Sequence, residues 1–321
     1  MTRRSEVPPP VTAVLDASST WLPTRLAEVE DLLREQVSGH GEPLAADAGA
    51  TLAAGGKRLR PLLVLLCAGP DGDADAVRAA TAIELVHMAT LVHDDILDAA
   101  PLRRGRPTVV AASGHGRAVG TGDLLFSRAF AILAAAGDAR SIELLAEASV
   151  ALARGELAQR QDAFDTGVSE QRYLERCRLK TATLFRCAML LGRDDEEMAL
   201  FGSSIGLAFQ LLDDVLDVSG PPERTGKARG TDLLDGTVTL PLILAAEREP
   251  ELAATDLRSL DAAAAEALCD RIAATGALDD VRSRALEMVA AAKAGLAGAG
   301  LDPETRRLLD LVADGVAQRY S

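Results

Sequence analysis

The chain has 321 residues, of which 48% are hydrophobic, 26% charged and only 3% aromatic, and its formal net charge is −14. The length allows one large core or two domains, and alanine- and leucine-rich segments with few aromatic or β-branched runs favour an all-α fold. The acidic balance disfavours nucleic acid as a partner. The four cysteines form no C-x-x-C pair, which argues against zinc or a disulfide framework.

We expect no secretory signal peptide at the N-terminus. Arg3 and Arg4 are basic, but prolines 8–10 follow where a signal peptide needs its apolar core. The longest apolar run, 62–68, is too short to span a bilayer. We therefore expect a cytoplasmic protein without a transmembrane segment, with a disordered tail at 1–15 and a single domain over 16–321.

Apolar residues at helical spacing predict a succession of helices along the chain. The predicted ranges are 21–37, 44–54, 76–98, 118–136, 141–163, 170–192, 196–218, 238–248, 251–275, 277–297 and 303–319. The range 76–98 is predicted to be one long amphipathic helix. These elements favour a single-domain bundle of about ten or more helices around a central cavity.

Two short acidic runs organise this pattern. Asp94-Asp95-Ile96-Leu97-Asp98 and Asp213-Asp214-Val215-Leu216-Asp217 both read D-D-x-x-D inside apolar segments. Within a helix, the first and last aspartates of each run share a face. Acid pairs with apolar flanks need a cation, and oxygen-only ligands favour Mg²⁺. We expect two helices that face each other across a cavity holding metal ions; a solvated helix face is the alternative for either run alone.

Basic residues gather in the same half of the sequence. Gly55-Gly56 precede Lys57-Arg58-Leu59-Arg60, in which Lys57 and Arg60 can converge on one phosphate group. Arg103 and Arg104 follow the first acidic run, where guanidinium groups suit a diphosphate; ion pairs from these arginines to Asp95 or Asp98 are the alternative. His87 could face the same cavity as Asp94.

Lys180 lies among small and apolar residues in the range 170–192. Its ammonium group could reach into the cavity as a point charge, or it could extend along the helix to solvent. The segment 219–232 is rich in glycine and proline and lies directly after the second acidic run, which is typical of a lid.

Taken in order, these motifs resemble the trans-isoprenyl diphosphate synthases, or polyprenyl synthetases, over about residues 50–245. Gly-Gly-Lys-Arg-Leu-Arg-Pro at 55–61 is similar to that family's isopentenyl diphosphate site. The stretch 87–98 with the arginine pair resembles the first aspartate-rich motif, and 208–214 resembles the second. Gly122-Asp123 resembles the start of the helix that follows the first motif. The domain over 16–321 would then be the catalytic domain of an isoprenoid synthase fold.

The resemblance implies a role for each matching residue. Two to three Mg²⁺ ions would be bound by Asp94, Asp98 and Asp213, with support from Asp95, Asp214 and Asp217. The allylic diphosphate would be held by Arg103, Lys180, Thr181, Gln210 and Lys227. Isopentenyl diphosphate would be held by Gly56, Lys57, Arg60, His87 and Arg104. The catalytic set would be Asp94, Asp98, Arg103, Lys180, Asp213 and Lys227.

The implied reaction is a Mg²⁺-dependent head-to-tail (1′-4) condensation of isopentenyl diphosphate with geranyl, farnesyl or geranylgeranyl diphosphate. Ala89 and Thr90 would set product length, and the small Ala89 leaves an apolar path open. We expect an all-trans product of C20 or longer, with C30–C50 favoured. Thr237 replaces a lysine that is frequent in the family, which suggests weaker diphosphate retention. A homodimer is expected from the family, with transient membrane contact at product release left open.

Three other interpretations compete with this one. A class I terpene cyclase usually has an Asn-, Ser- and Glu-based second metal motif, whereas here that motif is aspartate-rich. A non-catalytic subunit of a hetero-oligomeric synthase tends to lose its aspartates, and both sets are intact here. A plain helical scaffold would leave the buried acids unexplained. The sequence does not fix the exact product, the preferred primer or the pathway.

Overall fold

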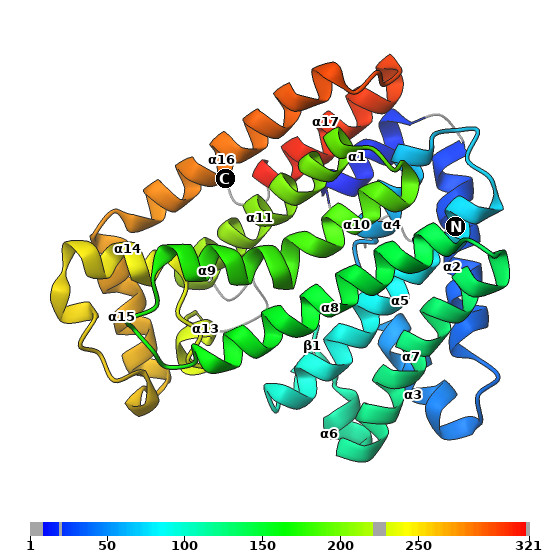
Figure 1. Cartoon of the computed structure of the whole chain (residues 1–321). Coiled ribbons are helices and arrows are strands. Elements are labelled where there is room, and N and C mark those ends of the chain that lie inside the picture. Colours follow the sequence, from blue (N-terminus) through cyan, green and yellow to red (C-terminus); the bar gives the residue numbers. More distant parts are fainter. Residues whose placement is uncertain (1–8, 19–20, 221–228, 319–321) are drawn as a thin grey trace. The chain divides into compact units, whose positions relative to one another are not determined.

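The computed structural model describes residues 9–18, 21–220 and 229–318, and these residues are almost entirely helical (Figure 1). These described residues form two compact units, the first within the ranges 1–149, 184–199 and 298–315 and the second within 150–183, 200–297 and 316–321. Helices α8 (Ala139–Gln161) and α11 (Glu196–Ser219) each contribute to both units. The predicted all-α class is confirmed.

The first unit holds the following further elements: α1 (Pro9–Ala17), α2 (Trp21–Val37), α3 (Glu42–Ala53), α4 (Leu59–Ala68), α5 (Ala74–Leu97), β1 (Leu102–Arg103), β2 (Arg106–Pro107), α6 (Val109–Ser113), α7 (His115–Ala136), α10 (Thr183–Gly192) and α17 (Pro303–Gln318). Helix α5 is its centre and packs against α7, α4 and α2 (Figure 1). Every residue from Ala79 to Val86 is buried, so α5 is surrounded on all sides and the predicted amphipathic character is wrong.

Local chemistry sets the ends of α5. The Asp73 side chain caps its start by accepting a hydrogen bond from the backbone N–H of Asp75 at 2.8 Å. The helix ends at Leu97, and Asp98 follows as its C-terminal cap. Pro101 comes three residues later and cannot extend the helix. The first acidic run therefore lies at the last turn of the central helix.

The second unit holds these further elements: α9 (Glu170–Cys177), the π-helical turn η2 (Arg178–Ala182), α13 (Thr231–Leu234), α14 (Leu240–Arg248), the 3₁₀ turns η3 (Pro250–Leu252) and η4 (Leu257–Ser259), α15 (Ala262–Ala274), α16 (Ala277–Gly295) and η5 (Leu296–Gly298). Within it, α14 packs against α16, α15 and α9 (Figure 1). Most predicted helices are present within a few residues of their expected bounds.

Four predictions about local structure were wrong. The range 251–275 begins with 3₁₀ turns, because Asp261 caps a new helix that starts only at Ala262. The range 170–192 is interrupted by a π turn. Gly122 lies inside α7, which begins at His115, and so does not start a helix. Residues 9–15 of the expected tail belong to α1, and residues 1–8 lie outside the described part.

Two helices, α7 and α11, are long and apolar enough to cross a membrane by length and composition alone. Buried core helices of soluble proteins meet the same criterion, and 61% of the apolar window of α11 is buried within the protein. α11 also carries the three aspartates of the second acidic run. We therefore read α11 as a core helix, whereas the apolar window of α7 is 39% buried and this helix packs against α5.

Candidate active site

The first acidic run places two carboxylates one helical turn apart. The backbone N–H of Asp98 donates to the carbonyl of Asp94 at 2.8 Å, which is the bond that closes an α-helical turn. Asp94 is half-buried and Asp98 is exposed. Two carboxylates with this spacing share one side of the helix end and can bind one cation together.

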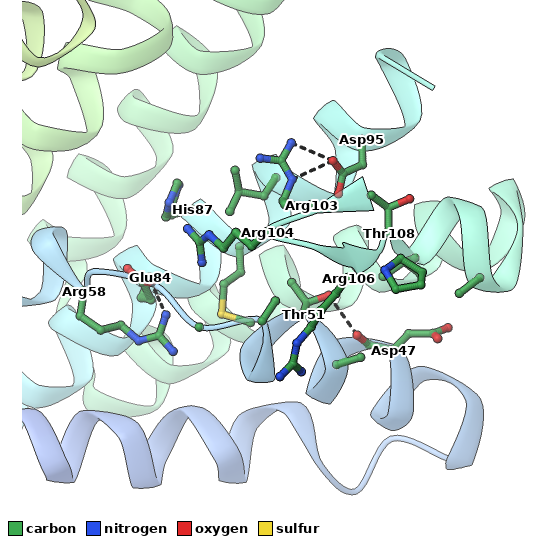
Figure 2. A pocket seen from close by; sticks show the side chains of 18 residues that line it. Asp47, Thr51, Arg58, Glu84, His87, Asp95, Arg103, Arg104, Arg106 and Thr108 are labelled. Atoms are coloured by element: carbon green, nitrogen blue, oxygen red, sulfur yellow. Dashed lines mark hydrogen bonds and ion pairs between the residues drawn. The ribbon is translucent and has the colours of Figure 1, made fainter. Parts of the chain in front are cut away.

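The middle acid of this run, Asp95, is buried and paired with Arg103. One of its carboxylate oxygens accepts a hydrogen bond from Nε of Arg103 and forms an ion pair with Nη2 of the same group, each at 2.7 Å (Figure 2). The ion pair that we considered as an alternative for Arg103 is therefore present. It leaves the rest of the guanidinium group at the wall of the neighbouring pocket.

A short β-hairpin carries the arginines, and the sequence analysis did not predict it. Strands β1 and β2 pair antiparallel, with Arg103 opposite Arg106. The two turn residues, Arg104 and Gly105, have φ of +52° and +72°, the combination that a type I′ turn requires. Because glycine adopts positive φ without strain, Gly105 allows this tight reversal. The hairpin therefore brings Arg103, Arg104 and Arg106 to one pocket.

This pocket has a volume of about 300 Å³ and lies wholly within the first unit (Figure 2). Its basic wall residues are Arg58, His87, Arg103, Arg104 and Arg106. Its acidic wall residues are Asp47, Glu84 and Asp95. Concentrated guanidinium groups in an otherwise acidic protein favour a phosphate-bearing ligand. The sequence-predicted residues His87 and Arg104 line it, whereas Gly56, Lys57 and Arg60 lie next to it in the chain without forming its wall.

Arg60 has an incompletely satisfied guanidinium group. It stacks over the ring of Phe185, with 4.9 Å from Cζ to the ring centre, and its Nε is buried without a hydrogen-bond partner. Burial lowers the pKa of Arg60 to about 10 against the opposing charge of Glu84, so the group remains cationic at neutral pH. An anion would satisfy both the charge and the orphan donor.

His87 is neutral at physiological pH. Burial lowers its pKa well below the ordinary value, and the charges of Arg60, Arg104, Arg103 and Arg58 act in the same direction. A neutral imidazole offers one N–H donor and one acceptor, so His87 can bind a phosphate oxygen by a hydrogen bond without adding charge.

Arg58 and Glu84 belong to the pocket; the sequence analysis included Arg58 in the basic run at 55–61 without a role of its own, and it missed Glu84. Arg58 Nη1 donates to Glu84 Oε1 at 2.9 Å, and Arg58 Nε donates to Glu30 Oε1 at 2.5 Å. Burial opposes the charge on Arg58, but the two glutamates outweigh it and raise its pKa. The signal for Glu84 was its position one helical turn before His87, on the same side of α5.

The second acidic run holds its middle acid differently. Asp214 is buried in the second unit and accepts hydrogen bonds from the Tyr173 hydroxyl and, at 2.7 Å, from Gln210 Nε2. Thr181 in turn donates to Gln210 Oε1 at 2.7 Å. Burial raises the pKa of Asp214 to about 7, although these hydrogen bonds oppose the rise. The sequence-predicted Thr181, Gln210 and Asp214 are thus joined in one chain, and Tyr173 is the member that was missed.

The outer acids of the second run differ in exposure. Asp213 is exposed, whereas Asp217 is half-buried. Asp217 Oδ2 accepts a bond from the backbone N–H of Asp232 at 3.3 Å, and its carbonyl accepts one from Gly230 at 3.0 Å. Asp217 therefore ties the start of α13 to α11, and Asp213 is the more accessible ligand candidate.

Lys180 lies in the π turn and forms an ion pair with Glu156 of α8. Burial would raise the pKa of Glu156, but Lys180 and Arg160 outweigh burial and lower it. The close approach depends on Gly155, because a Cβ there would lie 2.7 Å from the backbone nitrogen of Lys180. The lysine is therefore held by a partner carboxylate, which neither of the two predicted alternatives included. π turns are frequent at functional sites.

The remaining predicted residues are easily placed. Ala89 is fully buried in α5, and the Thr90 hydroxyl donates to the carbonyl of His87 at 2.8 Å. Gly122 of α7 faces His93, whose ring nitrogen would lie 2.1 Å from a Cβ at that position. Lys227 lies outside the described residues.

Carboxylate oxygens are the ligands that Mg²⁺ prefers, and in phosphate chemistry one or two of them act together with substrate oxygens. The pair Asp94 and Asp98 fits such an ion by spacing and exposure. Within the described ranges, no group of three or more His, Cys, Asp or Glu side chains forms a complete metal site.

Comparison with known proteins agrees with this chemistry. The polyprenyl synthetase family description matches residues 42–272. The chain is 41% identical to heptaprenyl diphosphate synthase component 2 of Geobacillus stearothermophilus over 246 residues, which are 73% of this chain and 77% of that protein. It is 37% identical to geranylgeranyl pyrophosphate synthase of Geoglobus acetivorans over 308 residues, covering 91% and 95% of the two chains.

A solved structure is similarly close. The polyprenyl synthase of Caulobacter crescentus CB15, complexed with calcium and isoprenyl diphosphate, superposes with a TM-score of 0.90 at 34% identity and covers 97% of this chain and 98% of that one. The family match includes both acidic runs and the arginine hairpin. The chain therefore belongs to the polyprenyl synthetase family and is a trans-prenyltransferase.

Proposed function

We propose that the protein condenses isopentenyl diphosphate with an allylic diphosphate, head to tail (1′-4) and with Mg²⁺, to give an all-trans polyprenyl diphosphate. Geranyl, farnesyl and geranylgeranyl diphosphates are the candidate primers. The observation that supports this most is the arginine-lined pocket, whose wall includes Asp95 of the first acidic run, the run that also carries Asp94 and Asp98. It provides donors for a phosphate group next to ligands for a hard cation.

In this proposal the acids bind the metal ions, and the basic and polar residues bind the two diphosphates. When bound, Mg²⁺ neutralises the charge that develops on the departing pyrophosphate. Asp94, Asp98 and Asp213 hold two to three such ions, and Arg103, Lys180, Thr181, Gln210 and Lys227 bind the allylic diphosphate. Gly56, Lys57, Arg60, His87 and Arg104 bind isopentenyl diphosphate. Fixed cationic donors of this kind stabilise the transition state electrostatically.

The middle acids have a supporting role. Asp95 fixes Arg103 through a hydrogen bond and an ion pair, and Asp214 fixes Gln210 and thereby Thr181. Each middle acid therefore orients donors, and we propose its neighbours in the run as metal ligands. Asp217 supports the second motif through its bond to Asp232.

The reaction itself tests the function. Purified protein is incubated with labelled isopentenyl diphosphate, an allylic primer and Mg²⁺, and the products are analysed by mass spectrometry. An elongated, uncyclised diphosphate supports the proposal. A cyclised hydrocarbon would indicate a class I terpene cyclase, and no turnover by the single purified chain would contradict the proposal.

Product length is proposed to be C20 or longer, with C30–C50 favoured, because Ala89 is small and fully buried in α5. Named relatives range from geranylgeranyl to octaprenyl diphosphate synthases. An Ala89→Phe substitution should shorten the product, and Ala80→Phe, at a buried position of the same helix further from the motif, is the control. If both variants give the parent's product, Ala89 does not limit length.

We further propose that the protein is a cytoplasmic homodimer. Transient contact with a membrane could accompany product release. One relative is named as component 2 of a heptaprenyl diphosphate synthase, so a two-component enzyme is the rival assembly. Sedimentation of the purified chain, combined with its activity alone, separates these two cases. An active dimer supports the proposal, and an inactive monomer contradicts it.

A further inference from the structure

An acid lies in the wall of the basic pocket. Glu84 comes from α5, its side chain is only 4% exposed, and it lines the pocket together with four arginines (Figure 2). A negative charge at this place weakens the Coulomb attraction between the pocket and a phosphate group. The presence of Glu84 in an anion site therefore requires a contribution that outweighs this loss.

Contacts of Glu84 indicate what that contribution is. Its Oε1 accepts a hydrogen bond from Arg58 Nη1 at 2.9 Å, while Arg58 Nε is held by Glu30 of α2. Arg58 also has a left-handed backbone, with φ of +48°, at the start of α4. Its guanidinium group is thus fixed between two helices, and free rotation of the side chain is removed before any ligand binds.

Gly56 shows that further groups converge on this point. A Cβ at Gly56 would lie 2.6 Å from Arg58 Nη1, 3.4 Å from Arg104 Nη1 and 3.6 Å from Glu84 Oε1. Two guanidinium groups and one carboxylate therefore surround a position that only glycine leaves open. Without the carboxylate, the two like charges would repel each other in a half-buried site.

The electrostatics of the arginines point the same way. Burial lowers the pKa of Arg104, and the charges of Arg103 and Arg58 act in the same direction, while Glu84 opposes them. For Arg60, too, Glu84 is the group that opposes burial. Glu84 is therefore a counter-charge shared by Arg58, Arg60 and Arg104.

We propose that Glu84 is a positioning residue, whose carboxylate holds Arg58 by a hydrogen bond and offsets the charge of the nearby Arg104, so that their donors are fixed before a diphosphate enters. Preorganised donors need no rearrangement on binding, which increases affinity. The proposal rests on the proposed function only in naming isopentenyl diphosphate as the ligand. The general ligand is an inorganic or prenyl diphosphate.

Removing the negative charge of Glu84 tests whether this residue strengthens or weakens diphosphate binding. In Glu84→Gln, Coulomb attraction alone predicts tighter binding of a diphosphate, whereas loss of positioning predicts weaker binding. Isothermal titration of the whole protein with inorganic pyrophosphate, without divalent metal, should show about tenfold weaker binding. Glu84→Asp should recover part of this loss. Equal or tighter binding by Glu84→Gln, with an unchanged melting temperature, would overturn the proposal.

Steady-state kinetics give a second readout. Glu84→Gln should raise the KM for isopentenyl diphosphate about tenfold and leave the KM for the allylic primer within about twofold. The matched control is Glu28→Gln, an exposed acid on α2 that pairs with Arg25 away from the pocket. Equal changes in both KM values would indicate general damage and contradict a positioning role.

A double substitution shows whether Glu84 acts through Arg58. In the Arg58→Gln background, adding Glu84→Gln should weaken pyrophosphate binding by clearly less than it does in the parent. Fully additive losses would contradict coupling between the two side chains. If Glu84→Gln does not fold, Arg58→Lys decides instead, since it keeps the charge but loses the fork between Glu30 and Glu84. Unchanged pyrophosphate binding by Arg58→Lys would then overturn the proposal.

Pyrophosphate binding also separates this proposal from the proposed function. Binding requires no turnover, so a parent protein that makes no product still reports the effect of Glu84. Absence of product with weakened binding in Glu84→Gln would contradict the proposed function and support the positioning role. Product formation by the parent, together with unchanged pyrophosphate binding in Glu84→Gln, would support the proposed function and contradict the positioning role.

Discussion

The two D-D-x-x-D motifs have the same pattern, and the protein holds their middle acids in different ways. Asp95 and Asp214 are both buried, with exposed fractions of 5% and 2%. Asp95 is paired with the cation Arg103, which comes from the β-hairpin. Asp214 has neutral donors, the Tyr173 hydroxyl and the Gln210 amide. Identical sequence patterns therefore lie in different electrostatic surroundings.

This difference has a chemical meaning. In the first motif, the buried acid is balanced by a full positive charge that also reaches the phosphate pocket. In the second, burial without a strong cation raises the pKa of Asp214 to about 7. The first motif is thus organised by an ion pair, and the second by a hydrogen-bond network that is sensitive to pH.

The largest effect should come from the outer acids that the two motifs share. We expect Asp94→Asn and Asp213→Asn each to lower kcat/KM by about 100-fold or more, because each removes a proposed metal ligand. Product formation at several Mg²⁺ concentrations measures this loss. Asp279→Asn, at an exposed site on α16, is the control. Full activity of either variant would remove that motif from the proposed metal site.

Removing the side chain that binds the middle acid should destabilise the protein more in the first motif than in the second. Arg103→Met removes a cationic partner from the buried Asp95 carboxylate and should cost about 2–3 kcal/mol of unfolding free energy. Tyr173→Phe removes one neutral donor and should cost about 1 kcal/mol. Urea unfolding measures both, with Arg34→Met at an exposed ion pair as the control. The reverse order of the two losses would contradict the comparison.

Stability should respond to pH in opposite directions in the two units. The folded pKa of Asp214 is raised to about 7 from 3.8, so the folded state binds more protons and stability falls as pH rises from about 4 to 7. The pKa of His87 is lowered below 6.5, so stability falls as pH drops below 6.5.

Each slope is measured by urea unfolding of metal-free protein. Relative to the parent, Asp214→Asn should become more stable as pH rises toward 7, with a slope of up to about 1.4 kcal/mol per pH unit. Relative to the parent, His87→Gln should become more stable as pH falls below 6.5. Parallel pH curves for a variant and its parent would show that the group in question does not titrate on unfolding.

The smallest effect concerns the position that departs from the family pattern. Thr237 follows Gly236 near the second motif, and its backbone N–H donates to the carbonyl of Asp232 at 2.7 Å. Thr237→Lys should lower the KM for the allylic diphosphate about threefold by adding a phosphate contact. Thr255→Lys, which adds the same charge elsewhere, is the control. Equal changes in both variants would mean that only net charge matters.

Much of the fold could be predicted because long helices repeat their apolar residues every three to four positions. Helix α2 was predicted with the bounds that it has, and α5 and α11 within two residues at either end. The two-residue strands at 102–103 and 106–107 are too short for any alternating pattern, so the hairpin was missed. The π turn was missed because Arg178–Ala182 contains no glycine or proline that would mark a break in a regular helix.

The candidate site, too, could be predicted only in part from the sequence. Charged residues at fixed spacing identified the two acidic runs and the arginines. Glu84, Arg58 and Tyr173 lie in contact with those residues only because the chain folds, at separations of 26 residues for Arg58–Glu84 and 41 for Tyr173–Asp214. The position of Glu84 one helical turn before His87 was a local signal, but no local pattern pairs Glu84 with Arg58 or Tyr173 with Asp214.

Gly155 offers a way to weaken the enzyme conditionally. It contributes no charged or polar side chain, yet a methyl group there would press on the main chain at Leu179 and Lys180, at 3.0 and 2.7 Å. Gly155→Ala should therefore strain this contact while keeping every proposed substrate-binding group. Such a variant is suited to a heat-sensitive allele, in which prenyl diphosphate supply could be switched off in a growing culture by a modest rise in temperature.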